Sequence, residues 1–386
     1  MNAPHCDIAI IGGGPVGAAL ALALRDSGLH VVVLEARRAD DAQADPRALA
    51  LSYGSRLLLQ RLGVWNAIAQ ISAIQTIHIS QKGSFGRTLL KAAELQVPDL
   101  GYVLPYPALH AALQDALPSS KASIMSGAAV TQLHSDASGA HISYLLDGSE
   151  HRLQARLAVV ADGGKLLEAS HPPAVHDYGQ SAVIAHLTCS LPQHNTAFER
   201  FTAQGPVALL PYRDGYELVW TMPHDQAQGA LQQDDATFLA QLHQHFGDRV
   251  GDFLSVGPRS CFPLRLKRAA QITLAHTALI GNAAQTMHPV AGQGFNMGLR
   301  DAWELAQTIL DCAPDAVGGD AMLAAYRQQR QIDRNTVIRF TDGLVRLFSN
   351  NLPLLNSVRG ASLSALDCLP PAKQFVARRM MFGANG

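Results

Sequence analysis

Three glycines follow a short apolar run near the start of the chain in the spacing G-x-G-x-x-G: Gly12, Gly14 and Gly17. Gly12 permits a tight turn, Gly14 lets a pyrophosphate approach the backbone, and Gly17 lets a helix pack closely on a strand. The N-terminus of the helix that follows would stabilise phosphate charge. Glu35, after the next apolar run, can accept hydrogen bonds from a ribose 2′-hydroxyl and disfavours a 2′-phosphate. The segment predicts a dinucleotide site, and both NAD and FAD fit it.

A second glycine-rich segment lies far downstream, at 281–301. Gly292 and Gly294 remove side chains where backbone amides could face a flat ring, and Asn296 can offer a donor and an acceptor to a uracil-like edge. A helix N-terminus directed at that ring would favour negative charge on a reduced flavin. The alternative is a plain loop between strand and helix. Together the two segments indicate one extended ligand held at both ends, which favours FAD.

Two charged residues stand at turns where they could complete such a site. Arg47 could clamp a phosphate or a flavin edge through its guanidinium, or form a surface salt bridge. Asp162 follows an apolar run at 156–160 and precedes two glycines. The carboxyl ends of strands are where α/β sheets bind ligands, although an ordinary turn would look the same.

The elements that must hold these residues alternate between strand and helix. Apolar runs predict strands at 7–11, 30–34, 156–160 and 278–280, and helical patterns follow the glycines at 18–25 and 294–310. The sequence pattern changes at 176–260. Strands are expected there at 182–188, 207–210 and 217–221, and a helix at 236–246. The pattern predicts an α/β protein with an inserted sheet that covers the ligand.

Composition narrows the function classes. The chain has 386 residues, 48% hydrophobic and 16% charged, with a formal net charge of −1, so nucleic acid is not an expected partner. Five scattered cysteines without C-x-x-C spacing favour reduced thiols in a cytoplasmic protein and support neither a zinc site nor a disulfide framework. No apolar run reaches the length of about 18 residues that would suggest a membrane span, and no basic leader is seen at the N-terminus.

Three motifs carry a resemblance to a known class of enzymes. They are the G-x-G-x-x-G glycines, Ala161-Asp162-Gly163, and the run His288-Pro289-x-Ala291-Gly292-Gln293-Gly294-x-Asn296-x-Gly298-x-x-Asp301. This set resembles the group A flavoprotein aromatic hydroxylases and, within them, the ubiquinone-biosynthesis flavin monooxygenases. The stretches 46–52, 197–202, 205–206 and 281–285 are most similar to the branch that acts on 2-polyprenyl-6-methoxyphenol. The likeness covers residues 5 to about 350.

The resemblance implies a Rossmann-like FAD-binding domain of the p-hydroxybenzoate hydroxylase type with an inserted β-sheet substrate domain. It implies FAD, NAD(P)H as electron donor and O2 as co-substrate, without a metal. A C4a-hydroperoxyflavin would transfer oxygen to a polyprenyl phenol, a lipid-like substrate. A flavin-dependent oxidase or dehydrogenase, or a non-catalytic flavoprotein subunit, remains an alternative.

Carried over to this sequence, the resemblance assigns residues to each part of FAD. Arg47 would contact the pyrophosphate region, Asp162 would serve both FAD and the nicotinamide donor, and Asn282 would stand at the ribityl chain. The adenosine end would be held by Gly12, Gly14, Gly17 and Glu35, and the isoalloxazine would lie beside Gly292, Gln293, Gly294 and Asn296. The chain departs from most relatives in carrying Asn282 instead of Asp, Leu166 instead of Ser, and His110 where Gln or Arg is usual.

The flavin would perform the oxygen transfer, and a base near the phenol would raise the electron density of the ring. His288 and Tyr212 are the candidates. Each has a structural alternative: His288 as a hydrogen-bonding loop residue, and Tyr212 as a half-buried strand residue.

The domain boundaries follow from these assignments. A discontinuous FAD-binding domain is expected at 1–70, 100–175 and 260–345, a substrate domain at 71–99 and 176–259, and a helical tail at 346–386. Within the tail, 375–382 mixes apolar and basic residues and could touch the inner face of the cytoplasmic membrane or a ubiquinone-biosynthesis protein complex. Packing on its own domain, or on a second subunit in a homo-oligomer, is the alternative.

Overall fold

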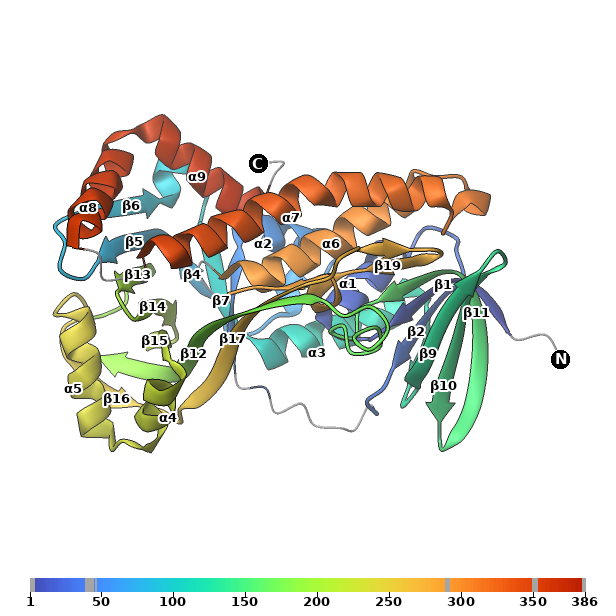
Figure 1. Ribbon diagram of the computed structural model, residues 1–386, viewed down its shortest axis with the longest axis horizontal. Coiled ribbons are helices and arrows are strands. Elements are labelled where there is room, and N and C mark those ends of the chain that lie inside the picture. Colours follow the sequence, from blue (N-terminus) through green and yellow to red (C-terminus); the bar gives the residue numbers. More distant parts are fainter. Residues whose placement is uncertain (1–3, 39–44, 46, 289–291, 349–352, 384–386) are drawn as a thin grey trace.

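Two large β-sheets lie toward opposite ends of the molecule, and long helices run between and over them (Figure 1). The computed structural model describes residues 4–38, 45, 47–288, 292–348 and 353–383. Pro46, Pro289 and Ala291 of the sequence motifs lie outside the described residues.

The first sheet has a parallel centre. Its path is β18 (Thr273–Leu274), β19 (Thr277–Leu279), β11 (Ser149–Val160), β1 (His5–Ile11), β2 (Val31–Glu35) and β8 (Ser123–Ser126). The strands from β19 to β8 pair in parallel, whereas β9 (Ala129–Asp136) and β10 (Gly139–Leu146) extend the sheet from β11 as antiparallel strands. Parallel alignment places the carboxyl ends of β1, β2, β11 and β19 at one edge, so the residues that follow these strands meet there.

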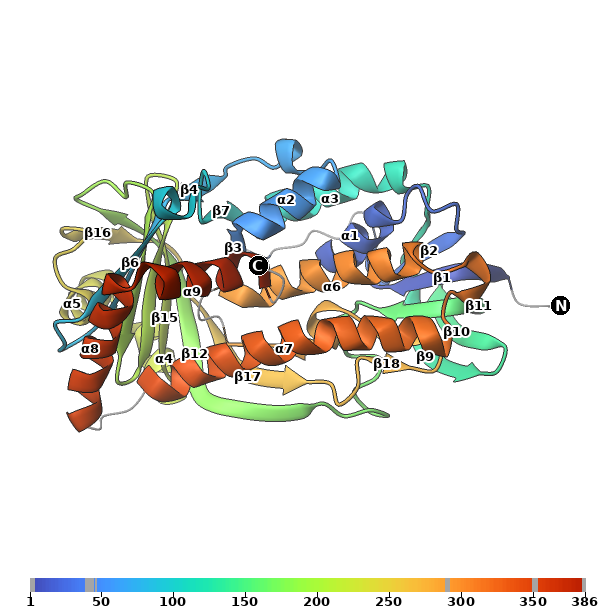
Figure 2. The same ribbon diagram turned by 90° about the horizontal axis from the view of Figure 1, so that it is seen from above.

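Helices bury this sheet. The helices α1 (Pro15–Ala23) and α3 (Tyr106–Ala116) pack together, and α1 also packs against α6 (Gln293–Leu310). The strand β1 and the helix α1 contribute fully buried side chains such as Ile8, Ile10, Leu20 and Leu22 to one core. The helix α7 (Asp320–Phe348) lies beside α6 and extends along much of the molecule (Figure 2).

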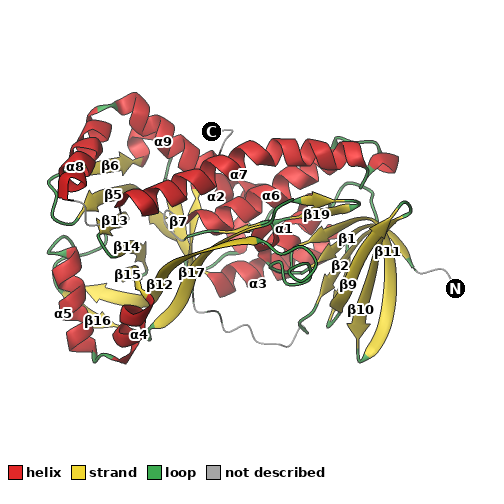
Figure 3. Cartoon of the chain, viewed as in Figure 1, coloured by secondary structure: helices red, strands yellow, loops and turns green. Residues whose placement is uncertain are grey.

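The second sheet is mostly antiparallel. Its path is β20 (Gln285–Thr286), β17 (Ser260–Arg268), β12 (Ala174–Cys189), β15 (Gly215–Pro223), β14 (Gly205–Tyr212), β13 (Thr196–Thr202), β5 (Thr76–Gln81) and β6 (Arg87–Lys91), and β16 (Phe253–Val256) pairs with β12. The helices α4 (His224–Gln232) and α5 (Asp235–Phe246) cover one of its faces (Figure 3), where Trp220 packs against Phe238.

A small sheet and the C-terminal helices complete the fold. The small sheet joins β3 (Ala48–Ser52), β7 (Gly101–Pro105) and β4 (Ser72–Ile74), and β3 leads into α2 (Tyr53–Arg61). The helix α8 (Pro353–Cys368) packs on β5 and β6, and α9 (Pro370–Phe382) packs on α2. Short 3-10 helices occupy Trp65–Ala67, Ala92–Leu95, Leu117–Ser120, Gly281–Ala283 and Pro314–Ala316.

The architecture is the expected one: an α/β unit built on a parallel sheet, with a second sheet inserted into it. Some residues that were expected in the FAD-binding part belong to the second sheet, including β20 and the first residues of β12. Residues 260–268, placed with the FAD-binding part from the sequence, form β17 of the second sheet. The reason is that β17 pairs with the long strand β12 along nine residue positions, so it continues the inserted sheet.

Candidate active site

A cavity of about 790 Å³ opens at the edge where the parallel strands end. Most of the residues predicted from the sequence to hold the cofactor line it. They are Gly12, Gly14, Glu35, Arg47, Asp162, Asn282 and Gly294. The strand order explains this meeting, since these residues follow β1, β2, β11 and β19 or begin the helices that face them.

The N-terminal glycines play separate structural roles. Gly12 has a φ of +107°, and a Cβ there would lie 2.7 Å from the carbonyl oxygen of Ala161. A Cβ on Gly17 would overlap the carbonyl oxygen of Gly12. Gly14, in contrast, has no protein atom within 4 Å of a Cβ position, and it begins α1 without a side-chain cap. The first turn of α1 therefore presents its backbone amides to the cavity, as an anion site requires.

Glu35 holds this turn from the end of β2. Its Oε2 accepts a hydrogen bond from the backbone N–H of Gly13 at 2.6 Å, and its Oε1 accepts from the Nε of Arg37 at 3.1 Å. Arg37 also lines the cavity and was missed in the sequence, where only its spacing from Glu35 could have pointed to it. A guanidinium at this position adds positive charge where a dinucleotide phosphate or ribose would lie.

Asp162 organises the loop that follows β11. Its two carboxylate oxygens accept hydrogen bonds from the backbone N–H of Gly164 at 2.7 Å and of Leu166 at 2.8 Å. Leu166 needs only its backbone for this contact, so the loop closes without the serine that relatives usually carry. His110, the other departure, stacks against Tyr106 with ring centroids 6.0 Å apart, and Tyr106 lines the cavity.

Arg47 lies at the cavity and forms a salt bridge as well. Its Nη2 is 2.6 Å from Oδ2 of Asp45, and its guanidinium lies over the ring of Phe262 at 5.2 Å. Hydrogen bonding to Asp45 raises the pKa of Arg47. The salt bridge with Asp45 positions the guanidinium of Arg47 at the cavity wall. A salt bridge and a contact with the cofactor, the two roles considered for Arg47 from the sequence, are therefore compatible.

A buried ionic cluster supports the other side of the cavity, behind the loop that carries Asn282. Oδ2 of Asp301 accepts hydrogen bonds from the backbone N–H of Gly281 at 3.0 Å and from Nε2 of Gln285 at 2.7 Å. Oδ1 of Asp301 accepts from Nε of Arg330 on α7 at 2.8 Å. Asn282 itself is exposed to the cavity, and no side-chain hydrogen bond of its amide occurs within the described part of the chain.

These observations fit FAD. The backbone is bare at Gly14 and Gly294, where no protein atom lies within 4 Å of a Cβ position, so a ligand can approach both segments. The uncapped start of α1 suits a pyrophosphate, Glu35 lies at the end of β2 where a ribose would bind, and the amide of Asn282 faces the cavity.

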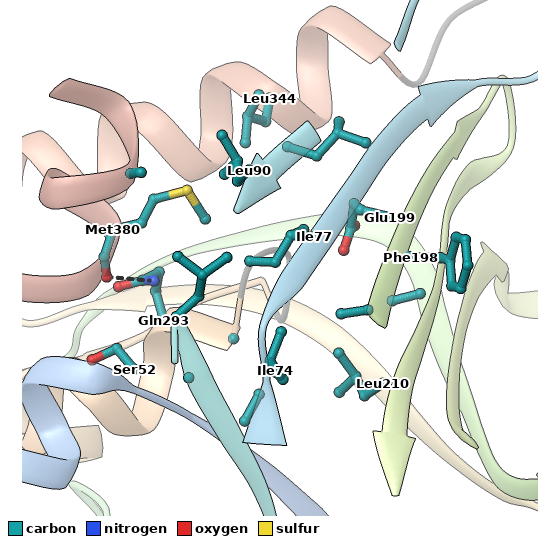
Figure 4. A pocket seen from close by; sticks show the side chains of 18 of the residues that line it. Ser52, Ile74, Ile77, Leu90, Phe198, Glu199, Leu210, Gln293, Leu344 and Met380 are labelled. Atoms are coloured by element: carbon teal, nitrogen blue, oxygen red, sulfur yellow. Dashed lines mark hydrogen bonds between the residues drawn. The ribbon is translucent and has the colours of Figure 1, made fainter. Parts of the chain in front are cut away.

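A second cavity of about 250 Å³ adjoins the loop at the start of α6 and is almost entirely apolar. Figure 4 shows its lining, with Gln293 and Met380 on one side and Leu210 and Phe198 on the other. Gly292, Gln293 and Asn296, predicted to lie beside the isoalloxazine, line this cavity, whereas Gly294 lines the larger one. The start of α6 therefore separates the two spaces.

The side-chain amide of Asn296 forms all of its hydrogen bonds with other groups of the protein. Its Nδ2 donates to the carbonyl oxygens of Ala50 at 3.0 Å and Gly292 at 2.6 Å. Its Oδ1 accepts from the backbone N–H of Ser52 at 2.8 Å and from Oγ of Ser55 at 2.7 Å. The expectation that this amide would pair with a uracil-like edge is therefore corrected: both ends of the amide tie β3 to α6. A contact between the ring and the backbone here stays a prediction.

The two candidate bases lie elsewhere. His288 is 1% exposed, its ring packs edge-on against Tyr178 with centroids 5.2 Å apart, and burial lowers its pKa to about 4. Tyr212 is buried in a cluster with Ile74 and Val103. Neither occurs among the described residues that line the two cavities. The structure thus gives both residues packing roles and leaves the catalytic assignment without geometric support.

Sequence reasoning also missed how the C-terminal segment is used. Val376, Ala377, Met380 and Met381 of α9 line the apolar cavity, and the carbonyl oxygen of Met381 accepts a hydrogen bond from Oγ of Ser52 at 2.9 Å. The apolar residues noted at 375–382 therefore pack mainly on the chain itself. Among the described residues, no helix has the length and hydropathy of a membrane span, and no group of three or more His, Cys, Asp or Glu forms a metal site.

Comparisons with known proteins agree with this geometry. The profile of the FAD binding domain family matches residues 5–341. The ubiquinone hydroxylase UbiL of Rhodospirillum rubrum is 33% identical, with 97% of this chain and 89% of that protein covered. The 3-demethoxyubiquinol 3-hydroxylase of Escherichia coli is 31% identical, with 95% and 96% covered.

Solved structures show the same fold at lower identity. The p-nitrophenol 4-monooxygenase PnpA of Pseudomonas putida superposes with a TM-score of 0.79 at 17% identity, covering 99% of both chains. HpxO of Klebsiella pneumoniae, complexed with FAD, superposes with a TM-score of 0.77 at 17% identity, covering 99% of this chain and 100% of that one. The chain therefore belongs to the family of FAD-dependent monooxygenases that includes the hydroxylases of ubiquinone biosynthesis.

Proposed function

We propose that this flavin hydroxylase uses NAD(P)H and O2 to hydroxylate the ring of a polyprenyl phenol, with 2-polyprenyl-6-methoxyphenol as substrate, in ubiquinone biosynthesis. The observation that carries the proposal is the apolar cavity of about 250 Å³ that lies across the start of α6 from the cofactor cavity. An aromatic ring placed there would lie next to the flavin end of FAD. Relatives named for ubiquinone hydroxylation, at 31–33% identity, support this substrate class.

The chain's own residues would hold the cofactor along the larger cavity. The start of α1 would bind the pyrophosphate, Glu35 the ribose and Asn282 the ribityl chain. When bound, FAD would supply electron transfer from NAD(P)H and the activation of O2. The protein's part is to orient the two rings and to exclude water, and the nearly apolar lining of the second cavity serves that exclusion.

The prenyl chain would extend away from the flavin toward the C-terminal helices. A further apolar cavity of about 160 Å³ lies between α7 and α9 and shares Phe340, Val376 and Met380 with the first one. Burial of apolar surface contributes roughly 25 cal/mol per Å². A prenyl chain that follows this path would therefore provide most of the binding energy and would leave the phenol at the flavin end.

The test is to reduce the FAD-loaded protein with NADH or NADPH without oxygen, and then to add oxygen together with a short-chain prenylphenol. We expect a product that is heavier by one oxygen atom, and labelled O2 should supply that atom. Reduction by NAD(P)H with formation of hydrogen peroxide alone would contradict the proposal and favour an oxidase. Failure of both donors to reduce the flavin would favour a non-catalytic flavoprotein.

A further inference from the structure

One carboxyl group faces the apolar cavity. Glu199 lies in the middle of β13 and lines the cavity, as do Ala197 and Phe201 on the same face of that strand. Its cross-strand partners are Ile79 on β5 and Ala208 on β14, both of which also line the cavity. Figure 4 shows Glu199 in this wall, across the view from Gln293 and Met380. A carboxyl group thus occupies the centre of an apolar sheet face.

No compensating group accompanies this carboxyl. Within the described part of the chain its oxygens make no hydrogen bond or salt bridge, and burial alone raises the pKa of Glu199 to about 7. The remaining described residues that line the cavity from β5, β14, β15, α7, α8 and α9 carry no titratable side chain. Arg200 lies on the other face of β13, where its Nε donates to the carbonyl oxygen of His245 at 2.9 Å. His78, on the other face of β5, packs against Phe198.

An acid in such a place is costly unless a ligand uses it. Buried polar groups are normally hydrogen-bonded, and an unpaired buried charge is strongly disfavoured. Structural acids of this protein follow that rule: Asp301 and Asp333 are fully buried, and arginines pair with both. Glu199 is half-buried, in the wall of the cavity. Glu199 departs from this rule in the wall of the cavity that is proposed to hold the phenol.

We propose that Glu199 is a catalytic residue: its carboxylate accepts a hydrogen bond from the phenol hydroxyl of the substrate and then takes the proton. This inference rests on the proposed function. In the step, the phenol O–H bond breaks, a new O–H bond forms at an Oε atom of Glu199, and the electron pair stays on the phenol oxygen. The ring carbons ortho and para to that oxygen become more nucleophilic. The carboxyl returns the proton when the product phenol forms, so no oxidant or reductant is consumed by this residue.

The geometry suits the role of a general base. Such a group works best when its pKa lies near the operating pH, and a carboxyl in an apolar wall meets that condition. The register also places Glu199 between apolar neighbours on both adjacent strands. The phenol hydroxyl would therefore find a single acceptor on this wall, which fixes the orientation of the ring as well as its protonation.

The test compares Glu199→Gln with Glu217→Gln in the FAD-loaded protein. Glu217 lies on β15 of the same sheet, burial likewise raises its pKa to about 7, and it does not line the cavity. We expect Glu199→Gln to keep its FAD and its reduction by NAD(P)H, and to lose about 10²-fold or more of the hydroxylated product. Product formation by the wild type should rise with pH through about 7, and only Glu199→Gln should flatten this rise. Glu199→Asp should restore part of the rate.

The outcomes separate the two proposals. If the wild type forms no hydroxylated phenol, the proposed function is wrong. If the wild type hydroxylates the phenol and Glu199→Gln does so at the same rate and with the same pH profile, the role of Glu199 is overturned while the function stands. Equal losses in Glu199→Gln and Glu217→Gln would also overturn it. A titration of the phenol, followed by flavin absorbance, checks that Glu199→Gln still binds substrate.

Discussion

A substitution at Gly14, in the turn before α1, should affect cofactor binding without affecting folding. The φ of Gly14 is −63°, and no protein atom lies within 4 Å of a Cβ there, so a side chain would cause neither strain nor a clash. We expect Gly14→Asp to purify without yellow colour, because the carboxylate would occupy and repel the pyrophosphate site. Its thermal midpoint should be near that of wild-type protein stripped of FAD. Gly229→Asp, in α4 and equally open, is the matched control that should keep its FAD. Normal flavin content in Gly14→Asp would refute the site.

We expect Glu199, the proposed catalytic base, to lower the stability of the folded protein at a pH at which its carboxyl is ionised. Its pKa is raised by burial to about 7 from a usual 4.5, so the folded protein binds the proton more tightly than the unfolded chain. The contribution of Glu199 to stability is therefore fully present below about pH 4.5 and is lost as pH rises through about 7. We expect Glu199→Gln to be more stable than the wild type at about pH 8, by up to roughly 3 kcal/mol, with no such gain at about pH 4. Thermal unfolding at both pH values measures this, and an equal gain at both would argue against a buried ionised carboxyl.

Residue types predicted part of the site well and part of it poorly. The glycines and Glu35 could be predicted because their roles depend on backbone conformation and on position after a strand, which local sequence encodes. His288 and Asn296 have side chains that suit catalysis or ring contact, but packing decided their roles. Glu199 was present in a recognisable stretch, yet only the pairing of β13 between β5 and β14 shows that its neighbours are apolar.

At the scale of elements, α6 and α7 are joined by a buried ionic cluster that supports the cofactor loop. Arg330 on α7 is 1% exposed and pairs with Asp301, Glu304 and Asp333 at 2.7–3.1 Å. Burial raises the pKa of Glu304, whereas for Asp333 the neighbouring Arg300 and Arg330 outweigh burial and lower its pKa. Without Arg330, Asp301 and Glu304 would lose the cation that pairs with them among the described residues, whereas Asp333 would keep Arg300.

We expect Arg330→Met to lower the free energy of unfolding by about 3–5 kcal/mol, because it leaves buried carboxylates unpaired. Affinity for FAD should also fall, since Asp301 holds the backbone N–H of Gly281 beside the cofactor cavity. The control is Lys267→Ala, which breaks an exposed pair with Glu168 and should cost less than about 1 kcal/mol. Denaturant unfolding and FAD titration give the two values, and a stable Arg330→Met with wild-type FAD affinity would contradict this role for the cluster.

A strand or helix could be predicted where its own residues show an apolar pattern or a capping residue. The strands β1, β2, β11 and β19 and the helix α5 agree with their apolar patterns. Asp234 caps α5 by accepting a hydrogen bond from the backbone N–H of Thr237 at 2.9 Å. Residues 260–268 were expected in the FAD-binding part, but they form β17 and pair with β12 of the second sheet. That partner lies more than seventy residues away in sequence, and no local pattern records the pairing.

At the scale of the whole molecule, the chain folds back so that its C-terminal helices complete the cavity begun by β13 and β5. Phe340 and Leu344 of α7, Leu363 and Leu366 of α8, and Val376 and Met380 of α9 all line it. A terminal segment that could have contacted a membrane or a partner therefore lines the apolar cavity that we propose for the substrate. Contact of α9 with a membrane surface or a protein complex, and assembly into a homo-oligomer, remain proposals; Phe375 of α9 is 60% exposed.

The apolar path from the flavin end to α9 should make binding depend on the length of the prenyl chain. Met380 lines both the cavity of about 250 Å³ and the cavity of about 160 Å³ between α7 and α9. A prenyl chain longer than the first cavity would have to pass it. We expect Met380→Trp to narrow this passage and to raise KM about tenfold or more for a long-chain prenylphenol, which corresponds to roughly 1.4 kcal/mol of lost binding. The KM for a phenol with a single short substituent should change little.

The matched control is Leu369→Trp, which adds the same bulk at an exposed position before α9. It should leave both KM values unchanged, because Leu369 does not line either cavity among the described residues. Equal effects of Met380→Trp on the short and the long phenol would mean that the prenyl chain leaves by another route. An effect confined to the long phenol would place its tail between α7 and α9, so that the ring is held at the flavin by the part of the substrate that does not react.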